Sequence, residues 1–168
     1  NLTYHREVPA AVFDFGASYR NDDLDDFDDE LADVDETGTR TDTRLSARLE
    51  TGRTSSIGFA IGAAYQSTEY QDASDPDLND STEATADLAM IFHATEIATG
   101  RIGLRYSQYE EEDAASTRTD TLTTYAGLDY ALSERLDLAA EIGYVERENE
   151  EFGVTDRTTG PDLSLGLT

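Results

Sequence analysis

The chain has 168 residues, enough for one domain with a substantial core. It contains no cysteine, which excludes disulfides and thiolate metal sites. Its 37 acidic residues against 12 basic ones, all arginine, give a formal charge of -25, and this charge argues against nucleic acid as a partner.

Apolar and polar residues alternate with a period of two along most of the chain, which is typical of strands with one apolar face. The alternation predicts eight strands, at 8–20, 41–51, 55–70, 83–96, 100–111, 119–132, 135–148 and 158–168. The longest apolar runs, 59–64 and 88–92, are far shorter than the roughly 18–20 residues of a spanning helix. Closed β-barrels nevertheless cross membranes with short strands. We expect a single all-β domain over 1–168.

The predicted connections alternate in length. Those at 52–54, 97–99 and 133–134 are very short, whereas those at 21–40, 71–82, 112–118 and 149–157 are long and acidic. In an antiparallel meander, this order places every long loop at one end and both termini with the short turns at the other. The sequence therefore predicts an up-and-down transmembrane barrel with short periplasmic turns and long acidic external loops.

The polar face of the predicted strands is rich in glycine and mixed charges. Four Gly-x-x-Tyr repeats, at 16–19, 62–65, 103–106 and 127–130, place glycine on the polar face and tyrosine on the apolar one. Exposed strand glycine is unfavourable, so we expect the polar face to point into a narrow lumen. The expected lumen charges are Arg44, Arg48, Glu50, Asp87, Arg101, Arg105, Asp129, Asp137 and Glu141.

Tyrosines end the apolar stripes toward the long loops. An interfacial aromatic girdle of Tyr19, Tyr65, Tyr106 and Tyr144 is expected from this placement. The alternative is a soluble acidic β-barrel that binds a small apolar ligand inside, with the apolar face turned inward.

The segment "RTDTLTTYAGLDYALSERLDLAAEIGYVERENEE" resembles the outer-membrane β-barrel porins of proteobacteria, in which two amphipathic strands flank a short turn. The resemblance covers 100–168 best, and it implies the outer membrane of a Gram-negative bacterium and contact with its lipid. Such barrels usually close with a strand that ends in an aromatic residue, but this chain ends "PDLSLGLT". Either the terminus is atypical or the chain is part of a larger barrel.

Clustered carboxylates suggest a weak cation site. Segment 21–36 is strongly acidic, and Asp25, Asp26, Asp28 and Asp29 are candidate ligands for loosely bound Ca²⁺. The segment lacks the ligand order of an EF-hand, so a solvated acidic loop is the simpler interpretation. No other cofactor is expected.

No catalytic constellation is expected. Asp87 and His93 share a face but lie about 20 Å apart along one strand, too far to hydrogen-bond, and His5 precedes the first predicted strand. The arginines of the expected lumen set either ion selectivity in a wide barrel or form a plug of ion pairs in a narrow one. We therefore expect a non-enzymatic porin-like or structural barrel that contacts lipid and either a neighbouring barrel or a protein partner.

Overall fold

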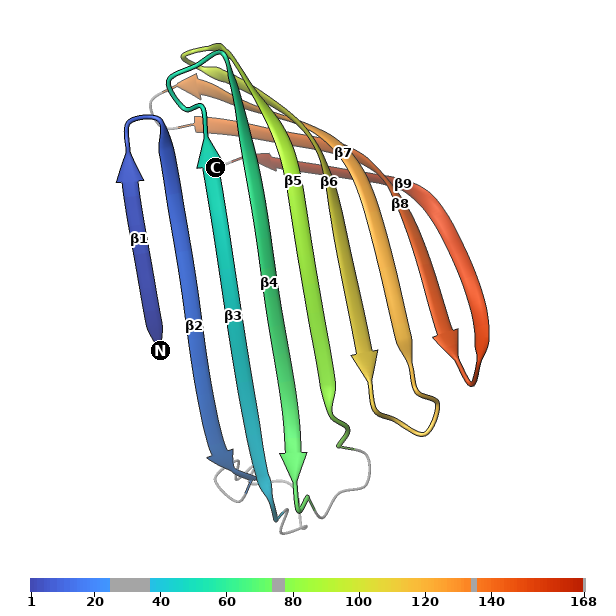
Figure 1. Ribbon diagram of the computed structural model, residues 1–168. Helices are drawn as coiled ribbons and strands as arrows, with labels where there is room; N and C mark the ends of the chain where they lie inside the picture. The colour runs from blue at the N-terminus through green and yellow to red at the C-terminus, as the bar shows by residue number, and fades with distance from the viewer. Residues whose placement is uncertain (25–36, 74–77, 134–135, 168) are drawn as a thin grey trace.

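The computed structural model describes residues 1–24, 37–73, 78–133 and 136–167, which form a single β-sheet. Its strands are β1 (Leu2–Val8), β2 (Ala11–Asp23), β3 (Thr39–Thr51), β4 (Ile57–Gln71), β5 (Ser81–Thr95), β6 (Ala98–Glu111), β7 (Arg118–Ser133), β8 (Leu136–Glu151) and β9 (Val154–Leu167). Each strand pairs antiparallel with the next (Figure 1), so the predicted all-β, up-and-down order is confirmed. Within the described ranges, no helix is long and apolar enough to cross a membrane.

The N-terminal strand β1 makes nine strands, so the prediction of eight is wrong. Arg6 interrupts the apolar side of β1 and Pro9 follows it, so the alternation alone does not separate this strand from a loop. The structure pairs β1 with β2, from Leu2 opposite Ala17 to Val8 opposite Ala11. His5 therefore lies within a strand. The N-terminus lies halfway along β2, and only the C-terminus lies at the short-turn end.

The link predicted at 149–157 is also wrong, because the observed turn is only Phe152-Gly153. The apolar stripe of β8 ends at Tyr144, but the pairing of β8 with β9 continues to Glu151 opposite Val154. Arg157 stabilises this polar extension through ion pairs with Glu146 at 3.2 Å and Glu148 at 2.9 Å. Loss of apolar alternation therefore marks where the apolar band ends and not where the strand ends.

The sheet curls but does not close. Its linear order begins at β1 and ends at β9, and these two edges do not pair with each other (Figure 1). Barrel closure, which the sequence predicts, is therefore not seen in this structure. The two edge strands also run in the same direction, because an antiparallel meander of nine strands begins and ends with strands of equal orientation.

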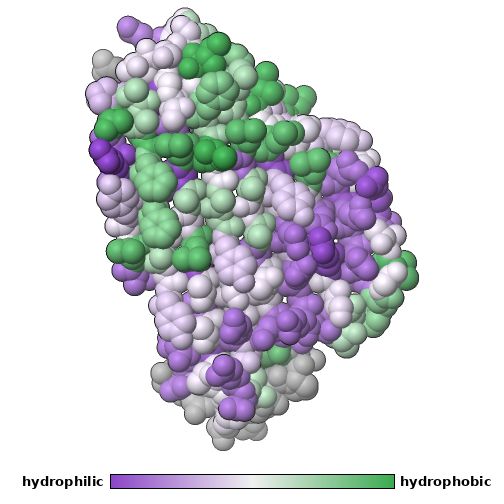
Figure 2. Space-filling view, in the orientation of Figure 1, coloured by the Kyte–Doolittle hydropathy of each residue, from purple (hydrophilic) through white to green (hydrophobic). Residues whose placement is uncertain are grey.

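The two faces of the sheet differ in chemistry and in exposure. The apolar face is on the outside of the curl, where large side chains such as Phe59, Ile61 and Ile142 are half or more exposed. Figure 2 shows apolar side chains over the upper part of this outer face and polar ones toward the long connections. The inner face carries the few buried groups, among them Ala60, Ala89 and Tyr125. An exposed apolar exterior is the reverse of a soluble barrel, so the soluble alternative does not hold.

Candidate functional site

The four predicted girdle tyrosines lie on the outer face and are exposed. Their register is regular: Tyr65, Tyr106 and Tyr144 trace across the intervening strands to positions opposite Ala17, Phe15 and Phe13 of β2. Tyr19 lies on β2 itself. The line through these tyrosines therefore shifts toward the short turns by two residues for every two strands.

This slope measures the angle between the strands and the tyrosine line. One residue of about 3.3 Å per strand spacing of about 4.8 Å corresponds to a strand tilt of about 35°. Strands in membrane barrels tilt by about 35–45°. The line through the girdle tyrosines is thus parallel to the membrane plane when the strands have the tilt of a membrane barrel.

On the short-turn side of each girdle tyrosine, the outer face is apolar for a constant length. The segments are Ala11–Tyr19, Ile57–Tyr65, Ala98–Tyr106 and Leu136–Tyr144, each of nine residues. At the tilt above, nine residues rise about 22 Å, close to the roughly 25 Å apolar band of outer-membrane barrels. Across the described parts of β2 to β9, outward positions inside this band carry no charged side chain.

The predicted charges lie on the inner face, and the register joins some of them in one row. Arg48, Gly62, Asp87 and Arg105 are successive partners across β3, β4, β5 and β6. Asp87 lies against Gly62, which has no side chain in the way, and its carboxylate is 3.8 Å from Arg48. Asp87 thus lies between Arg48 of β3 and Arg105 of β6 in this row.

Two further glycines accommodate large side chains lying flat along the sheet. A Cβ at Gly103 would lie 2.6 Å from the Tyr125 ring, and one at Gly127 would lie 2.6 Å from Nε of Arg101. The guanidinium of Arg105 stacks over Tyr125 at 5.0 Å. The inner-face glycines therefore let long side chains run along the wall instead of across the space inside the curl.

Glu141 is the shared partner of two arginines. Its carboxylate is 3.9 Å from both Arg101 and Arg105, and Arg101 also contacts Asp129 at 3.3 Å. Arg101, Arg105 and Asp129 line a hollow of about 510 Å³ on the inner face, together with Arg48 and Asp87. His93 lies in the same hollow, and its Nε2 is buried without a hydrogen-bond partner among the described residues.

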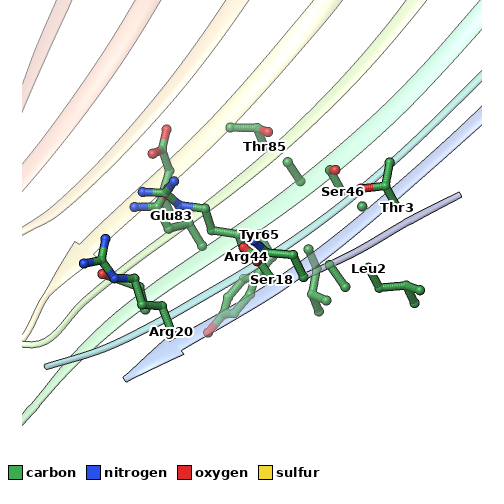
Figure 3. Close-up of a pocket in the computed structure, with 16 residues that line it drawn as sticks. Leu2, Thr3, Ser18, Arg20, Arg44, Ser46, Tyr65, Glu83 and Thr85 are labelled. Carbon is green, nitrogen blue, oxygen red and sulfur yellow. The ribbon is translucent and has the colours of Figure 1, made fainter. Parts of the chain in front are cut away.

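Of the remaining predicted inner-face charges, Glu50 lines the short-turn side of the same hollow, whereas Asp137 and Arg44 lie outside it. Glu50 is 3.7 Å from Arg53 at the short turn after β3, and Asp137 lies on the inner side of β8 near its start. Arg44 lines a second hollow nearer the long connections (Figure 3), with Ser18 and Glu83. The positions of all nine predicted charges are thus on one face, while their role inside a lumen stays a prediction.

The acidic connections are described only in part. The candidate Ca²⁺ ligands Asp25, Asp26, Asp28 and Asp29 lie outside the described residues. In the connection 112–117, Asp113 accepts hydrogen bonds from the backbone and hydroxyl of Thr117, at 2.9 and 2.8 Å, and from the N–H of Ala115. These bonds, the backbone one of Thr117 foremost, hold the pKa of Asp113 below its usual range. This carboxylate stabilises a turn of its own loop.

Sequence reasoning missed Tyr125 and the pairing of Gly62, Gly103 and Gly127 each with one larger side chain. Tyr125 was visible as an aromatic residue on the polar side of its strand. Its partner Gly103 is identified only by the β6–β7 register, which places the two residues opposite each other.

Comparison with known proteins agrees with the geometry. A family model of Gram-negative porins matches residues 8–150, most of the chain. Neither the curated proteins nor the solved structures that were compared gave a match. The family confirms the resemblance seen in the hairpins of 100–168. The chain therefore belongs to the Gram-negative porin family, and its place is the outer membrane.

Proposed function

We propose that this chain forms the wall of a transmembrane β-barrel whose inner face lines a passage for small hydrophilic solutes. The observation that carries the barrel is the tyrosine line, whose slope across the strands matches the tilt of membrane barrels. A flat or irregular sheet has no reason to keep an outer band of constant length along this slope, with no charged side chain at its described outward positions on β2 to β9.

Closure of the barrel follows from the proposed location. Unpaired N–H and C=O groups at the β1 and β9 edges are very costly in hydrocarbon, so both edges need partners there. Because β1 and β9 run in the same direction, antiparallel closure requires an odd number of further strands between them. The total is then even, as in bacterial outer-membrane barrels.

The way the charged side chains pack favours an open passage over a plug. Asp87, Tyr125 and Arg101 each lie against a glycine of the neighbouring strand, so their length extends along the wall. Some ion pairs of this face connect neighbouring strands. Others cross one intervening strand at a position where that strand has a glycine. We propose a water-filled lumen with mixed charges and no catalytic role.

The external side of the proposed barrel is acidic. The whole chain has a net charge of -25, and the connections 24–38, 72–80 and 112–117 hold 14 acidic residues and no basic one, so the field at this end attracts cations and repels anions. We propose a preference for cations, lipid as the main contact of the outer face, and Ca²⁺ held only loosely by the acidic loops.

The test is reconstitution of the folded protein into planar bilayers, with heat-modifiable migration on a gel as the check of folding. We expect a cation-preferring current. Glu141→Gln leaves Arg101 and Arg105 less compensated, so its reversal potential is expected to shift toward anions. Glu69→Gln, on the outer face above the girdle, is the matched control and is expected to leave the reversal potential unchanged.

Two results would overturn this function. A heat-modifiable, correctly inserted protein that carries no current would show that the lumen is sealed and the barrel is a scaffold. A current that is identical in wild type and Glu141→Gln would show that this cluster does not face the ion path.

A further inference from the structure

The turn between β8 and β9 contains an aromatic residue that its backbone does not favour. Phe152 and Gly153 form a two-residue hairpin turn with φ of 51° and 71°. Turns with positive φ at both positions favour Asn, Asp or Gly at the first one, and a bulky residue there is an outlier. The other positive-φ residues besides glycine in the described ranges are Asp72 and Ser116, which turns accept readily.

Packing does not explain Phe152 either. Its side chain is 75% exposed, and that of the adjacent Val154 is 70% exposed. Phe152 lies eight residues beyond the girdle residue Tyr144, about 26 Å along the strand, so the ring is not part of the membrane-facing band. A bulky residue kept at an unfavourable turn position, with the exposed Val154 two residues away, points to a contact with another molecule.

A hydrogen bond to the neighbouring connection holds the backbone of the hairpin tip. The backbone N–H of Phe152 donates to the carbonyl of Ala115 at 2.9 Å, which ties the hairpin to the connection 112–117. Asp113 orders that connection through its bonds to Ala115 and Thr117. The backbone that carries the ring is thus held in place, and binding to the ring does not require the turn to be ordered first.

The charge around the tip defines the partner. Glu150 and Glu151 precede the turn, and Glu111 and Glu112 lie in the neighbouring segment tied to it. In the part of the chain that the structure describes, neither Glu150 nor Glu151 forms an ion pair. Arg118, opposite Glu150 in the register, pairs with Glu110 and Asp120. Arg157 is engaged by Glu146 and Glu148. The surface therefore combines an exposed apolar tip with free negative charge.

We propose that the Phe152 hairpin tip is a docking site for a cationic polypeptide segment that carries an apolar side chain. Lysine or arginine of the partner meets the tip glutamates, and its apolar side chain packs on Phe152 and Val154. Aromatic anchors inside a charged rim are the usual source of affinity and specificity at such sites. The site goes beyond the proposed passage and is independent of whether the lumen conducts.

The test uses the folded protein in nanodiscs of zwitterionic lipid, with empty nanodiscs as the blank. Two probes are compared by fluorescence anisotropy: a peptide of six lysines around a central leucine, and the same peptide with serine at the centre. We expect wild type to bind the leucine peptide about tenfold more tightly than the serine peptide. Phe152→Asn is expected to abolish that preference while leaving affinity for the serine peptide unchanged.

The variant Phe152→Asn separates a structural role from a binding role. Asparagine is favoured at this turn position, so the hairpin should be at least as stable as in wild type, with unchanged heat-modifiable migration. Ser116→Asn, at another positive-φ position, is the matched control and should keep the leucine preference. Joint change of Glu150 and Glu151 to Gln should weaken both peptides. Retention of the leucine preference in Phe152→Asn would overturn the proposal, as would equal binding of both peptides by wild type.

Discussion

Arginine placed in the outer face tests the tilted apolar band directly. Ile61 and Tyr144 belong to the same hydrogen-bonded row of the sheet, through Leu88, Leu104 and Thr124. If the hydrogen-bonded rows ran parallel to the membrane plane, the side chains of Ile61 and Tyr144 would lie at equal depth in the bilayer. The tyrosine line places Ile61 at the centre of Ile57–Tyr65 and Tyr144 at the edge of Leu136–Tyr144.

The expected costs follow from these depths. Ile61 is four residues from either end of its segment, which is about 11 Å of depth at the inferred tilt. Arginine at the bilayer midplane costs about 2–4 kcal/mol and near the interface about 0–1 kcal/mol. We expect Ile61→Arg to lose about 2–4 kcal/mol relative to Ile61→Ala, and Tyr144→Arg at most about 1 kcal/mol relative to Tyr144→Ala. The measurement is urea unfolding of the protein in lipid vesicles.

A second readout covers the case in which Ile61→Arg fails to insert. The chain has no tryptophan, so a single one at position 61 or 144 reports its own depth. Brominated lipids should quench Ile61→Trp most when the bromines lie near the acyl-chain ends, and Tyr144→Trp most when they lie near the headgroup. Equal arginine costs at the two positions, or equal quenching profiles, would refute the tilted band.

Two further predictions concern the inner face and the loop 112–117. Gly103→Ala forces the Tyr125 ring to move, because the new Cβ would lie 2.6 Å from it, and it should lower the free energy of unfolding by about 1–3 kcal/mol in a thermal unfolding experiment. Gly160→Ala, with nothing within 4 Å of the new Cβ, should leave the stability unchanged. Equal effects of the two changes would argue against the flat packing of Tyr125. The lowered pKa of Asp113 means that its stabilisation is present at neutral pH, begins to fade as pH falls below the unfolded-state value and is lost through the folded-state pKa. Amide exchange of Ala115 and Thr117 should therefore quicken in acid. In Asp113→Ala, which has no side-chain acceptor, this exchange should be fast already at neutral pH, and wild-type exchange in that variant would contradict this role.

Much of the fold was predictable because strand periodicity is local. Alternation placed Leu138 and Ile142 on one face and Asp137 and Glu141 on the other, and the structure keeps both assignments. Strand limits were predicted wrongly where the alternation of apolar and polar residues changes before the strand ends. Arg6 broke the apolar pattern of β1, and the charges after Tyr144 hid seven more residues of β8.

The chemistry of the candidate site was only half predictable. Sequence alone identified which side chains carry charge and which face they share, because strand neighbours alternate by geometry. It did not show that Asp87 reaches Arg48 across Gly62, or that Glu141 serves both Arg101 and Arg105. Such pairs depend on register between distant segments, and one residue of slip would move every partner to the other face.

The sequence by itself determined the meander, the two chemically distinct faces and the tyrosine at the end of each apolar stripe, since each depends on residues a few positions apart. Only the tertiary structure decided the one-residue offset per strand that aligns Tyr19, Tyr65, Tyr106 and Tyr144 into a tilted line. It also decided that Tyr125 lies on Gly103 and that Phe152 occupies a turn position unfavourable to it. Register and backbone conformation arise from pairing between strands, and no single stretch of the chain contains that information.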